Sequence, residues 1–541
     1  MKRRLAQVFL ALYPLGFVCA PILSLYASNA GTFRLGVVAL PILYAILGTA
    51  LVMALMGLRL RQLRKSAVAT SYFAILFFSH GHFHRIAVDL GIAEWLAGWL
   101  LFVLGSALAA VGLFGVARAR NLALLTRVLG VAAVAMVALP TAHIASFELA
   151  TRQKVQSARD SVAVVPRAAH TARRDQLPDI YYIVLDGYAR HDVLRDRFDY
   201  DNEPFLDFLG SRGFRVARRS RANYCQTALS MSSVFNMDYV HNLVVARPQF
   251  SDLAPLRERI RNNRVVSMLR RLGYTIVTFS NATDMLELES PDIHFQGRSL
   301  DEFHVGVLDL TPVPMLVGRL VPAAGLPLEP YRAHHANVHF KFEQLGRLSE
   351  YKRPLFTYAH FLVPHPPFVF DATGTFLDPM RPYSVRERDW AEGYRDGYRR
   401  NVQFVNTQLE KTIDAIRAQS TRPPVIILQS DHGPASGWLE FWNENQHWNT
   451  KEPHIIRERL PVLNAMLVPG GPPSGFEADV SLVNTFRIVL NECFGAAYDL
   501  LPDHSFFSSY DTPYRLYQVD DILNANGDAD EEGDEDVPAG R

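Results

Sequence analysis

The stretch IYYIVLDG, residues 180–187, decides how the second half of this chain folds. Six apolar residues, rich in β-branched and aromatic side chains, run without interruption and end in Asp186 and Gly187. Unbroken apolar runs of this length are typical of strands that are buried on both faces of a sheet. In parallel sheets ligands bind at the carboxyl ends of the strands, so Asp186 is placed where a ligand would lie.

Similar runs recur along the second half of the chain. They are YTIVTFSN (274–281), LFTYAHFLVP (355–364), VIILQSDHG (425–433) and LNAMLVPG (463–470). Helical patterns separate them, and in residues 398–419 Val402, Val405, Leu409, Ile413 and Ile416 recur at helical spacing. Strands that alternate with amphipathic helices predict an α/β sandwich domain with a mostly parallel central sheet. We expect this catalytic domain over residues 179–523.

The first part of the chain is apolar in a different way. Five apolar runs lie at about 6–27, 35–58, 66–83, 95–116 and 123–146, each close to the roughly 20 residues that a bilayer requires. They predict a transmembrane domain of five helices over residues 1–147. The basic segments MKRR, RLRQLRK (59–65) and ARARN (117–121) fall at alternate ends of these runs, which places the N-terminus in the cytoplasm. We therefore expect a multi-pass protein of a bacterial-type cytoplasmic (inner) membrane with its catalytic domain on the periplasmic side.

Composition limits the remaining choices. A formal net charge of +1 provides no field that would attract nucleic acid. Three cysteines, Cys19, Cys225 and Cys493, are too few for a disulfide framework or a CxxC zinc site, and a disulfide between Cys225 and Cys493 stays open. Residues 148–178 are expected to form a basic linker, and the acidic residues 524–541 a disordered tail.

Polar residues follow two of the predicted strands. Asp186 ends the first strand, and Asp431 and His432 end a later one. For each residue alone, a place in a turn is the simpler interpretation. Together they offer two oxygens and one nitrogen at a single rim, which suits one divalent ion, zinc or manganese, with room for a second.

Thr227 is the candidate nucleophile. TALSMSSVF, residues 227–235, is typical of a helix start, where backbone N–H groups favour a phosphate. A divalent ion would lower the pKa of the hydroxyl. The alternative is a threonine that only caps the helix. Ser230 competes, but we expect it to bond back to the backbone, and Asn223 is a weaker substrate-binding candidate.

Four motifs together resemble a known family. YYIVLDG (181–187), NYCQTALSMSS (223–233), PHPPF (364–368) and QSDHG (429–433) are similar to those of the alkaline phosphatase/sulfatase superfamily. The closest resemblance is to its membrane-anchored branch, which contains lipid A phosphoethanolamine transferases and lipoteichoic acid synthase. The resemblance implies that Asp186 is the first metal ligand, where those transferases use Glu. It implies that Thr227 is nucleophile and ligand, that Asp431 and His432 complete the metal site, and that His365 serves the substrate or leaving group.

The nucleophile motif separates this chain from formylglycine-dependent sulfatases. Those enzymes modify a Cys or Ser within Cys-x-Pro-x-Arg, but QTAL follows Cys225 here, so sulfate ester hydrolysis by that route is not expected. Cys225 is better interpreted as a small buried residue or half of a disulfide. His360, His447 and His454 could support a second metal, but a structural or lid role is favoured for each.

Residues and resemblance together predict a membrane-anchored, metal-dependent phosphotransferase. It would move a phospholipid headgroup, phosphoethanolamine or phosphoglycerol, through a phospho-threonine intermediate to a glycan or lipid acceptor of the cell envelope. One alternative is a sulfatase-like hydrolase or phosphodiesterase that uses water. A second alternative is a non-catalytic pseudoenzyme.

Overall fold

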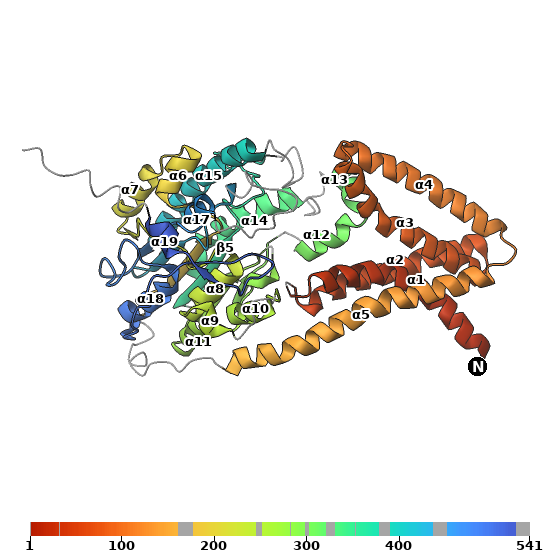
Figure 1. The fold of residues 1–541 in the computed structure, drawn as a ribbon, viewed down its shortest axis with the longest axis horizontal. Helices are drawn as coiled ribbons and strands as arrows, with labels where there is room; N and C mark the ends of the chain where they lie inside the picture. Colours follow the sequence, from red (N-terminus) through yellow and green to blue (C-terminus); the bar gives the residue numbers. More distant parts are fainter. Residues whose placement is uncertain are drawn as a thin grey trace, which may run out of the picture. The chain divides into compact units, whose positions relative to one another are not determined.

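The computed structural model describes residues 2–31, 33–160, 177–244, 251–281, 283–297, 302–320, 330–351, 353–377, 390–436 and 452–525 (Figure 1). The chain divides into two compact units. The helical unit comprises Met1–Gln153, Ala282–Asp284 and Ser299–Pro330. The α/β unit comprises Lys154–Asn281, Met285–Arg298 and Tyr331–Arg541.

Five long helices build the helical unit, and three of them are long and apolar enough to cross a membrane. The three candidate spans are Leu35–Leu60, Trp95–Arg118 and Ala123–Leu149. They belong to α2 (Ala39–Leu60), α4 (Glu94–Arg118) and α5 (Ala123–Asp160). In α1 (Lys2–Ser28) the apolar segment found is the shorter Leu12–Ser28, and α3 (Leu63–Asp89) is not among the candidates. Helices form where five spans were predicted, but five membrane spans are not confirmed.

The sequence and packing of α3 explain this difference. Its second half carries SHGHFHR, residues 79–85, which lowers its hydropathy. In its first half Ser66, Thr70 and Ser71 are buried, and the helix packs against α1, α2 and α4. Protein rather than lipid surrounds much of this helix, so small and polar residues are tolerated at its contacts.

Helix α5 changes the predicted linker. It runs through 38 residues to Asp160, so the segment predicted as a linker at 148–178 begins as helix. At about 1.5 Å per residue this helix is roughly twice as long as the hydrocarbon core, about 30 Å, is thick. Residues 161–176 of that linker and residues 526–541 of the predicted tail lie outside the described residues.

The segment of α12 (Glu302–Asp309) and α13 (Val313–Leu320) belongs to the helical unit, although we expected residues 179–523 to form one domain. Phe303 is 1% exposed and packs edge-on against Tyr26 and Phe33. The Gly81 N–H of α3 donates to the Leu310 carbonyl at 3.1 Å. A Cβ at Gly81 would lie 1.9 Å from a carbonyl oxygen of the same segment, so this close approach requires a glycine. The predicted domain boundary is corrected accordingly.

The α/β unit is built on a seven-stranded sheet of order β2-β7-β6-β1-β5-β3-β4. β6, β1, β5, β3 and β4 are parallel, whereas β7 is antiparallel to β6 and β2 to β7. The five predicted strands are all present, so the mostly parallel sheet is confirmed, and the short edge strands β2 and β4 are additional. The strands are β1 (Ile180–Leu185), β2 (Arg215–Val216), β3 (Thr275–Phe279), β4 (Ile293–Phe295), β5 (Leu355–Phe361), β6 (Val425–Gln429) and β7 (Asn464–Leu467).

Strand β1 separates two apolar cores. Its even-numbered residues face α8, α10, α11, α17 and α18, and its odd-numbered residues face α6, α7, α14 and α15. All six residues are 0% exposed, which explains why the strand shows no polar alternation. These helices are α6 (His191–Phe198), α7 (Glu203–Ser211), α8 (Thr227–Asn236), α10 (Ala254–Arg261), α11 (Arg264–Arg271), α14 (Pro330–Leu345), α15 (Trp390–Gln419), α17 (Pro453–Arg459) and α18 (Thr485–Phe494).

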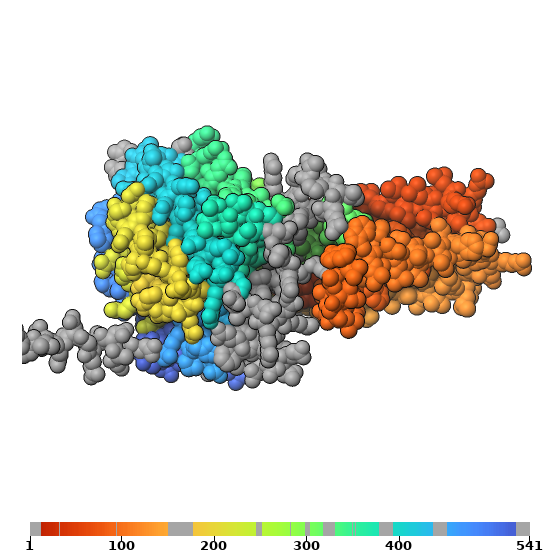
Figure 2. All heavy atoms as spheres, turned by 90° about the horizontal axis from the view of Figure 1, so that it is seen from above, coloured from red at the N-terminus to blue at the C-terminus, as the bar shows by residue number. Residues whose placement is uncertain are grey.

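Helix α15 confirms the helical spacing found in the sequence. Val402, Val405, Leu409, Ile413 and Ile416 are all 0% exposed and pack in the core on one side of the sheet. The helix begins eight residues before the predicted start at 398. Figure 2 shows the outer surface that α6, α7 and α15 form over this core. With helices on both faces, the open positions of the sheet are at its strand ends.

Candidate active site

Three neighbouring strands end at one site. β1 lies between β5 and β6, and the parallel register pairs Val184 with His360 of β5 and with Gln429 of β6. Asp186 follows β1 directly, and Asp431 and His432 follow β6. The parallel topology therefore joins two motifs that lie far apart in the sequence.

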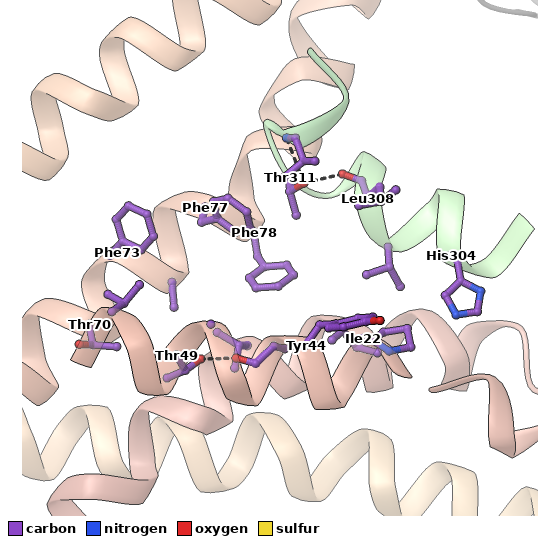
Figure 3. Close-up of a pocket in the computed structure, with 18 residues that line it drawn as sticks. Ile22, Tyr44, Thr49, Thr70, Phe73, Phe77, Phe78, His304, Leu308 and Thr311 are labelled. Atoms are coloured by element: carbon purple, nitrogen blue, oxygen red, sulfur yellow. Dashed lines mark hydrogen bonds between the residues drawn. The ribbon is translucent and has the colours of Figure 1, made fainter. Parts of the chain in front are cut away.

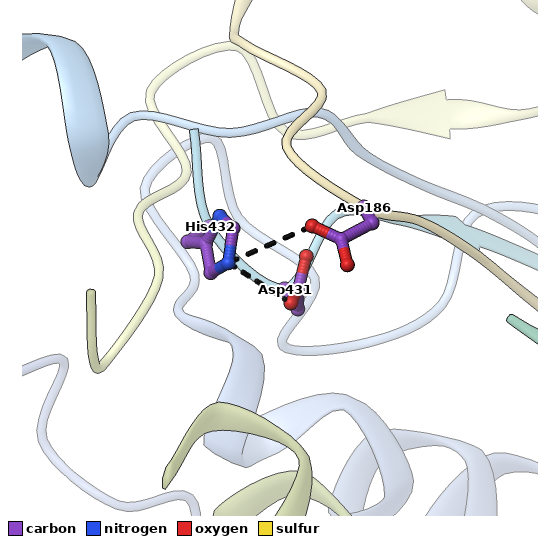
Figure 4. A group of neighbouring side chains, drawn as sticks. All are labelled: Asp186, Asp431 and His432. Carbon is purple, nitrogen blue, oxygen red and sulfur yellow. Dashed lines mark ion pairs between the residues drawn. The ribbon is translucent and has the colours of Figure 1, made fainter. Parts of the chain in front are cut away.

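Asp186, Asp431 and His432 form a buried cluster, with their polar atoms turned toward one another (Figure 4). One ligand atom from each lies within 4.8 Å of the others. His432 Nε2 is 3.6 Å from Asp186 Oδ1 and 3.3 Å from Asp431 Oδ2. The structure thus brings together the three residues that the sequence places on one rim.

One oxygen of each carboxylate is available to bind a cation. Asp186 Oδ1 and Asp431 Oδ2 are buried and have no hydrogen-bond partner among the described residues. Two buried carboxylates are costly unless a positive charge compensates them. A tetrahedral ion with bonds of about 2.0 Å separates its ligands by about 3.3 Å, close to the two distances from His432 Nε2 to the carboxylates. The cluster therefore fits a divalent metal ion.

The surroundings of His432 prepare it as a ligand. Nδ1 donates to the Gly433 carbonyl at 3.0 Å, so Nε2, beside the carboxylates, is the ring nitrogen that carries the lone pair. Burial, and next the Arg459 guanidinium, lowers the pKa of His432 to about 4. The imidazole is therefore neutral at pH 7, as a metal ligand must be.

His360 supports Asp186 and is not part of the cluster. Its Nε2 lies 3.4 Å from Asp186 Oδ2, and its Nδ1 lies 3.3 Å from the Tyr358 hydroxyl. Burial alone would raise the pKa of Asp186, but the imidazoles of His365 and His360 outweigh it and hold the pKa well below its usual value. Asp186 is therefore ionised. These contacts fit a structural role for His360, which stays a prediction.

Thr227 is the first residue of α8, and its hydroxyl reaches the cluster. Thr227 Oγ1 lies 3.0 Å from His432 Nε2, the nitrogen beside both carboxylates. Gln226 occupies the N-cap position, so the interpretation of Thr227 as a simple cap is wrong. Ser230 donates to the Tyr224 carbonyl at 3.1 Å, as expected of this competitor. Of these two hydroxyls, Thr227 is the one placed beside the cluster of Asp186, Asp431 and His432.

The sequence comparison agrees with this arrangement. A model of the sulfatase family matches residues 178–458, slightly more than half of the 541 residues. The chain belongs to the sulfatase family. It is therefore a sulfatase-like enzyme of the alkaline phosphatase superfamily, as the four motifs predicted. No protein with a curated description matches the chain in sequence.

Several solved structures are similar in fold. The zinc complex of the C-terminal periplasmic domain of EcEptC from Escherichia coli is 12% identical, with 66% of this chain and 97% of that chain covered and a TM-score of 0.41. Lipooligosaccharide phosphoethanolamine transferase A from Neisseria meningitidis is 14% identical, with coverages of 90% and 95% and a TM-score of 0.39. Phosphonate monoester hydrolase of Agrobacterium radiobacter is 15% identical, with coverages of 61% and 80% and a TM-score of 0.39. These likenesses concern the fold alone.

Cys225 does not take part in the site's chemistry as a thiolate. It is 0% exposed, its Sγ donates to the Ser508 carbonyl at 3.3 Å, and burial raises the pKa of its thiol. Cys19, Cys225 and Cys493 are all free, so the disulfide left open by the sequence is not formed. Cys225 is therefore a small buried residue of this sulfatase-family chain.

His365 lies beside Asp186. Its backbone N–H donates to the Asp186 carbonyl at 3.0 Å. A Cβ on Gly187, which has a φ of +77°, would lie 3.7 Å from the His365 Cβ. Nδ1 donates to the Pro366 carbonyl at 2.6 Å, so Nε2 is the ring nitrogen left to exchange a proton with a bound ligand.

The weaker candidates have other roles or positions. The Asn223 amide donates to Ser481 Oγ at 3.0 Å and to the His504 carbonyl at 2.8 Å, and its oxygen accepts a backbone N–H at 2.8 Å. Its bonds within the fold do not support a substrate contact. His454 lies in α17 and outside the cluster, and His447 lies outside the described residues.

Arg459, which the sequence analysis missed, connects the two active-site loops. Its Nε donates to the Cys225 carbonyl at 3.0 Å and its Nη1 to the Gly433 carbonyl at 2.6 Å. Its Nη2 donates to His432 Nε2 at 3.0 Å, the same nitrogen that Thr227 contacts. No motif marks it, because a basic residue in the last turn of a helix is ordinary. The guanidinium places a permanent positive charge beside the candidate nucleophile.

We expect Gly433→Ala to destabilise the protein by about 2 kcal/mol and to reduce its metal content. A Cβ there would lie 2.4 Å from the Glu458 carbonyl oxygen, and the Gly433 N–H donates to the Arg459 carbonyl at 2.6 Å. The loop that carries Asp431 and His432 would therefore have to move. Thermal unfolding and metal analysis of the purified full-length protein measure the two effects.

Gly210→Ala is the matched control for this substitution. A Cβ at Gly210 in α7 would meet nothing within 4 Å, and alanine favours a helix over glycine. This variant should keep the stability and metal content of the parent or gain stability. If Gly433→Ala behaves in the same way, the close contact of this loop with the end of α17 is not what holds the cluster.

Proposed function

We propose that this protein is a membrane-anchored, metal-dependent phosphotransferase that moves a phospholipid headgroup, phosphoethanolamine or phosphoglycerol, to a glycan or lipid acceptor of the cell envelope. The observation that carries the proposal is the Thr227 hydroxyl, 3.0 Å from His432 Nε2 and beside the carboxylates of Asp186 and Asp431. The candidate membrane spans in the same chain would keep the catalytic unit close to a lipid donor. The basic segments between the helices support a periplasmic position for that unit.

Different residues would hold the metal ion and bind the phosphoryl oxygens of the donor. Asp186, Thr227, Asp431 and His432 would hold one divalent ion, zinc or manganese. When bound, the ion would lower the pKa of a neighbouring hydroxyl and neutralise phosphoryl charge. Backbone N–H groups at the start of α8, which begins at Thr227, would favour an anion at the same place. Arg459 adds its fixed charge for the phosphoryl oxygens.

The transfer takes two balanced steps. Thr227 Oγ1 releases its proton to solvent water and bonds to the donor phosphorus, and the bond from phosphorus to the diacylglycerol oxygen breaks. His365 Nε2 protonates that oxygen, so diacylglycerol leaves as an alcohol. In the second step an acceptor hydroxyl gives its proton to His365 and attacks phosphorus. The bond to Thr227 breaks, and Thr227 takes a proton from solvent water, while His365 keeps the acceptor's proton for the next cycle.

Membership in the sulfatase family favours a second candidate, a hydrolase or phosphodiesterase in which water replaces the acceptor. The same residues would serve both reactions. The reactions differ only in where the headgroup goes after it leaves Thr227.

A headgroup-labelled phospholipid separates the candidates. The full-length protein in vesicles that contain labelled phosphatidylethanolamine or phosphatidylglycerol, with membrane glycolipid as acceptor, should place the label first on the Thr227 peptide and then on a membrane-bound product. Peptide mass spectrometry and extraction of the lipids measure both. Label that appears only in solution supports the hydrolase. Label that stays on the donor supports a pseudoenzyme and contradicts the proposal.

A further inference from the structure

The helical unit contains an apolar cavity that the proposed chemistry does not use (Figure 3). Its volume is about 520 Å³, which lies within the usual size range of ligand sites. Residues of α1, α2, α3 and the α12–α13 segment line it, among them Ile22, Tyr44, Phe73, Phe77, Phe78 and Leu308. Its walls therefore come from two of the three sequence regions that form the helical unit.

The lining offers a ligand mainly hydrocarbon, with the Thr70 hydroxyl as a buried polar group that has no hydrogen-bond partner among the described residues. The Thr49 hydroxyl donates to the Ala45 carbonyl of its own helix at 2.6 Å. The Thr311 hydroxyl donates to the Leu308 carbonyl at 2.7 Å. These two hydroxyls of the wall are thus already used within the backbone, and the aromatic and aliphatic side chains dominate the rest. Such a cavity suits a hydrocarbon chain.

The cavity lies at one end of the membrane helices. Ile22 is in the last third of α1, and Pro41 is the third residue of α2, so the turn between these helices lies at the same end. The α12–α13 segment also contributes to this end. The chain reaches that segment after β4 and returns to the sheet at β5. The α12–α13 segment, inserted in the sequence between β4 and β5, thus forms part of the cavity wall.

The membrane lipid that surrounds the helices indicates which molecule fills the cavity. Leu43, Leu47 and Leu51 of α2 are 48%, 57% and 62% exposed, as expected of side chains that face acyl chains. Hydrocarbon is therefore what surrounds the helices that line the cavity. We propose that the cavity binds one acyl chain of a glycerophospholipid, and, resting on the proposed function, that this lipid is the headgroup donor.

Gly48→Phe tests the proposal by filling the cavity. Gly48 lines it, and a Cβ there would meet nothing within 4 Å, so a large side chain can enter without a clash. Gly57→Phe on the same helix is the matched control, since Gly57 is equally open but is not a lining residue. Both variants are made in the full-length protein, alone and combined with Thr227→Ala, which prevents turnover of the probe.

The first measurement needs no catalysis. Phosphatidylethanolamine with a photoactivatable group on one acyl chain is added to the protein in lipid nanodiscs, and labelled peptides are mapped after illumination. Labelling of residues 73–78 should be concentrated over other membrane peptides and should fall at least tenfold in Gly48→Phe, about 1.4 kcal/mol, but not in Gly57→Phe. Equal labelling in both variants, or labelling spread evenly over α2 and α4, overturns the proposal.

The second measurement separates the cavity from the chemistry. Gly48→Phe should lower kcat/KM about tenfold for a long-chain donor and leave a dihexanoyl donor unchanged, whereas Thr227→Ala abolishes transfer from both. If the cavity is labelled but no headgroup is transferred, the acyl-chain site is supported and the proposed function is overturned. If kcat/KM falls equally for both donors, Gly48→Phe damages the protein in general. That result would overturn the role of the cavity in donor binding.

Discussion

Replacing Thr227 by alanine should lower kcat/KM for headgroup transfer by at least about a thousandfold and remove the covalent intermediate. The hydroxyl is the attacking group in the proposed reaction, and its contact with His432 Nε2 at 3.0 Å is a single hydrogen bond on a half-buried side chain. The free energy of unfolding should therefore change by less than about 1.5 kcal/mol. Steady-state kinetics, the mass of the Thr227 peptide and thermal unfolding measure the three effects.

Two neighbouring variants sharpen this result. Thr227→Ser keeps an attacking hydroxyl and should retain measurable transfer together with a modified peptide. Ser230→Ala removes a hydroxyl that donates to the Tyr224 carbonyl inside the helix, and transfer should stay close to that of the parent. Transfer within tenfold of the parent in Thr227→Ala would exclude Thr227 as the nucleophile.

Removal of divalent ions should destabilise the parent protein and abolish its activity, and Asp431→Asn should abolish the response to a chelator. An ion present at a hundred times its Kd stabilises the folded state by about 2.7 kcal/mol. Asp431 supplies one of the buried oxygens that have no hydrogen-bond partner among the described residues. Thermal unfolding and metal analysis with and without chelator measure the difference.

Without a metal ion, Asp431→Asn should be more stable than the parent protein. Without an ion, the parent buries the Asp431 charge beside that of Asp186, whereas asparagine removes the charge and still accepts the Gly187 N–H that now bonds to Oδ1 at 3.3 Å. Metal-free Asp431→Asn should therefore unfold at a higher temperature than the metal-free parent. Asp414→Asn, which alters an exposed ion pair with Arg212, is the control and should respond to chelator as the parent does. If Asp431→Asn responds to the chelator as the parent does, the cluster of Asp186, Asp431 and His432 is not the metal site.

Local sequence was enough to predict the central strands and the cluster. The residues of β1 are apolar on both faces because two cores enclose them, and the motif residues follow strands whose carboxyl ends must meet. Thr227 carried a signal because a helix start is visible in sequence. The roles of these residues in transfer remain predictions.

Other features could not be predicted because tertiary contacts alone define them. Arg459 acts through carbonyl groups of Cys225 and Gly433, and a backbone acceptor leaves no mark on the sequence. The α12–α13 segment has no hydrophobic run long enough for a span, so its place with the membrane helices depends on contacts such as Phe303 with Tyr26. Five spans were predicted from hydropathy, and three candidate spans are found among the described residues, so the count of five is not confirmed; α3, with its buried polar residues, is not among the three.

The detour of the chain between β4 and β5 affects how the enzyme can be produced. During synthesis the membrane helices emerge first, while β5, the direct neighbour of β1, emerges only after Ser299–Pro330 has been made. A truncated product that starts near residue 179 would carry Phe303 and its neighbours without the aromatic rings that normally cover them. Such a fragment would expose a hydrophobic patch and would aggregate. Replacement of Ser299–Pro330 by a short polar linker is therefore the rational route to a water-soluble form.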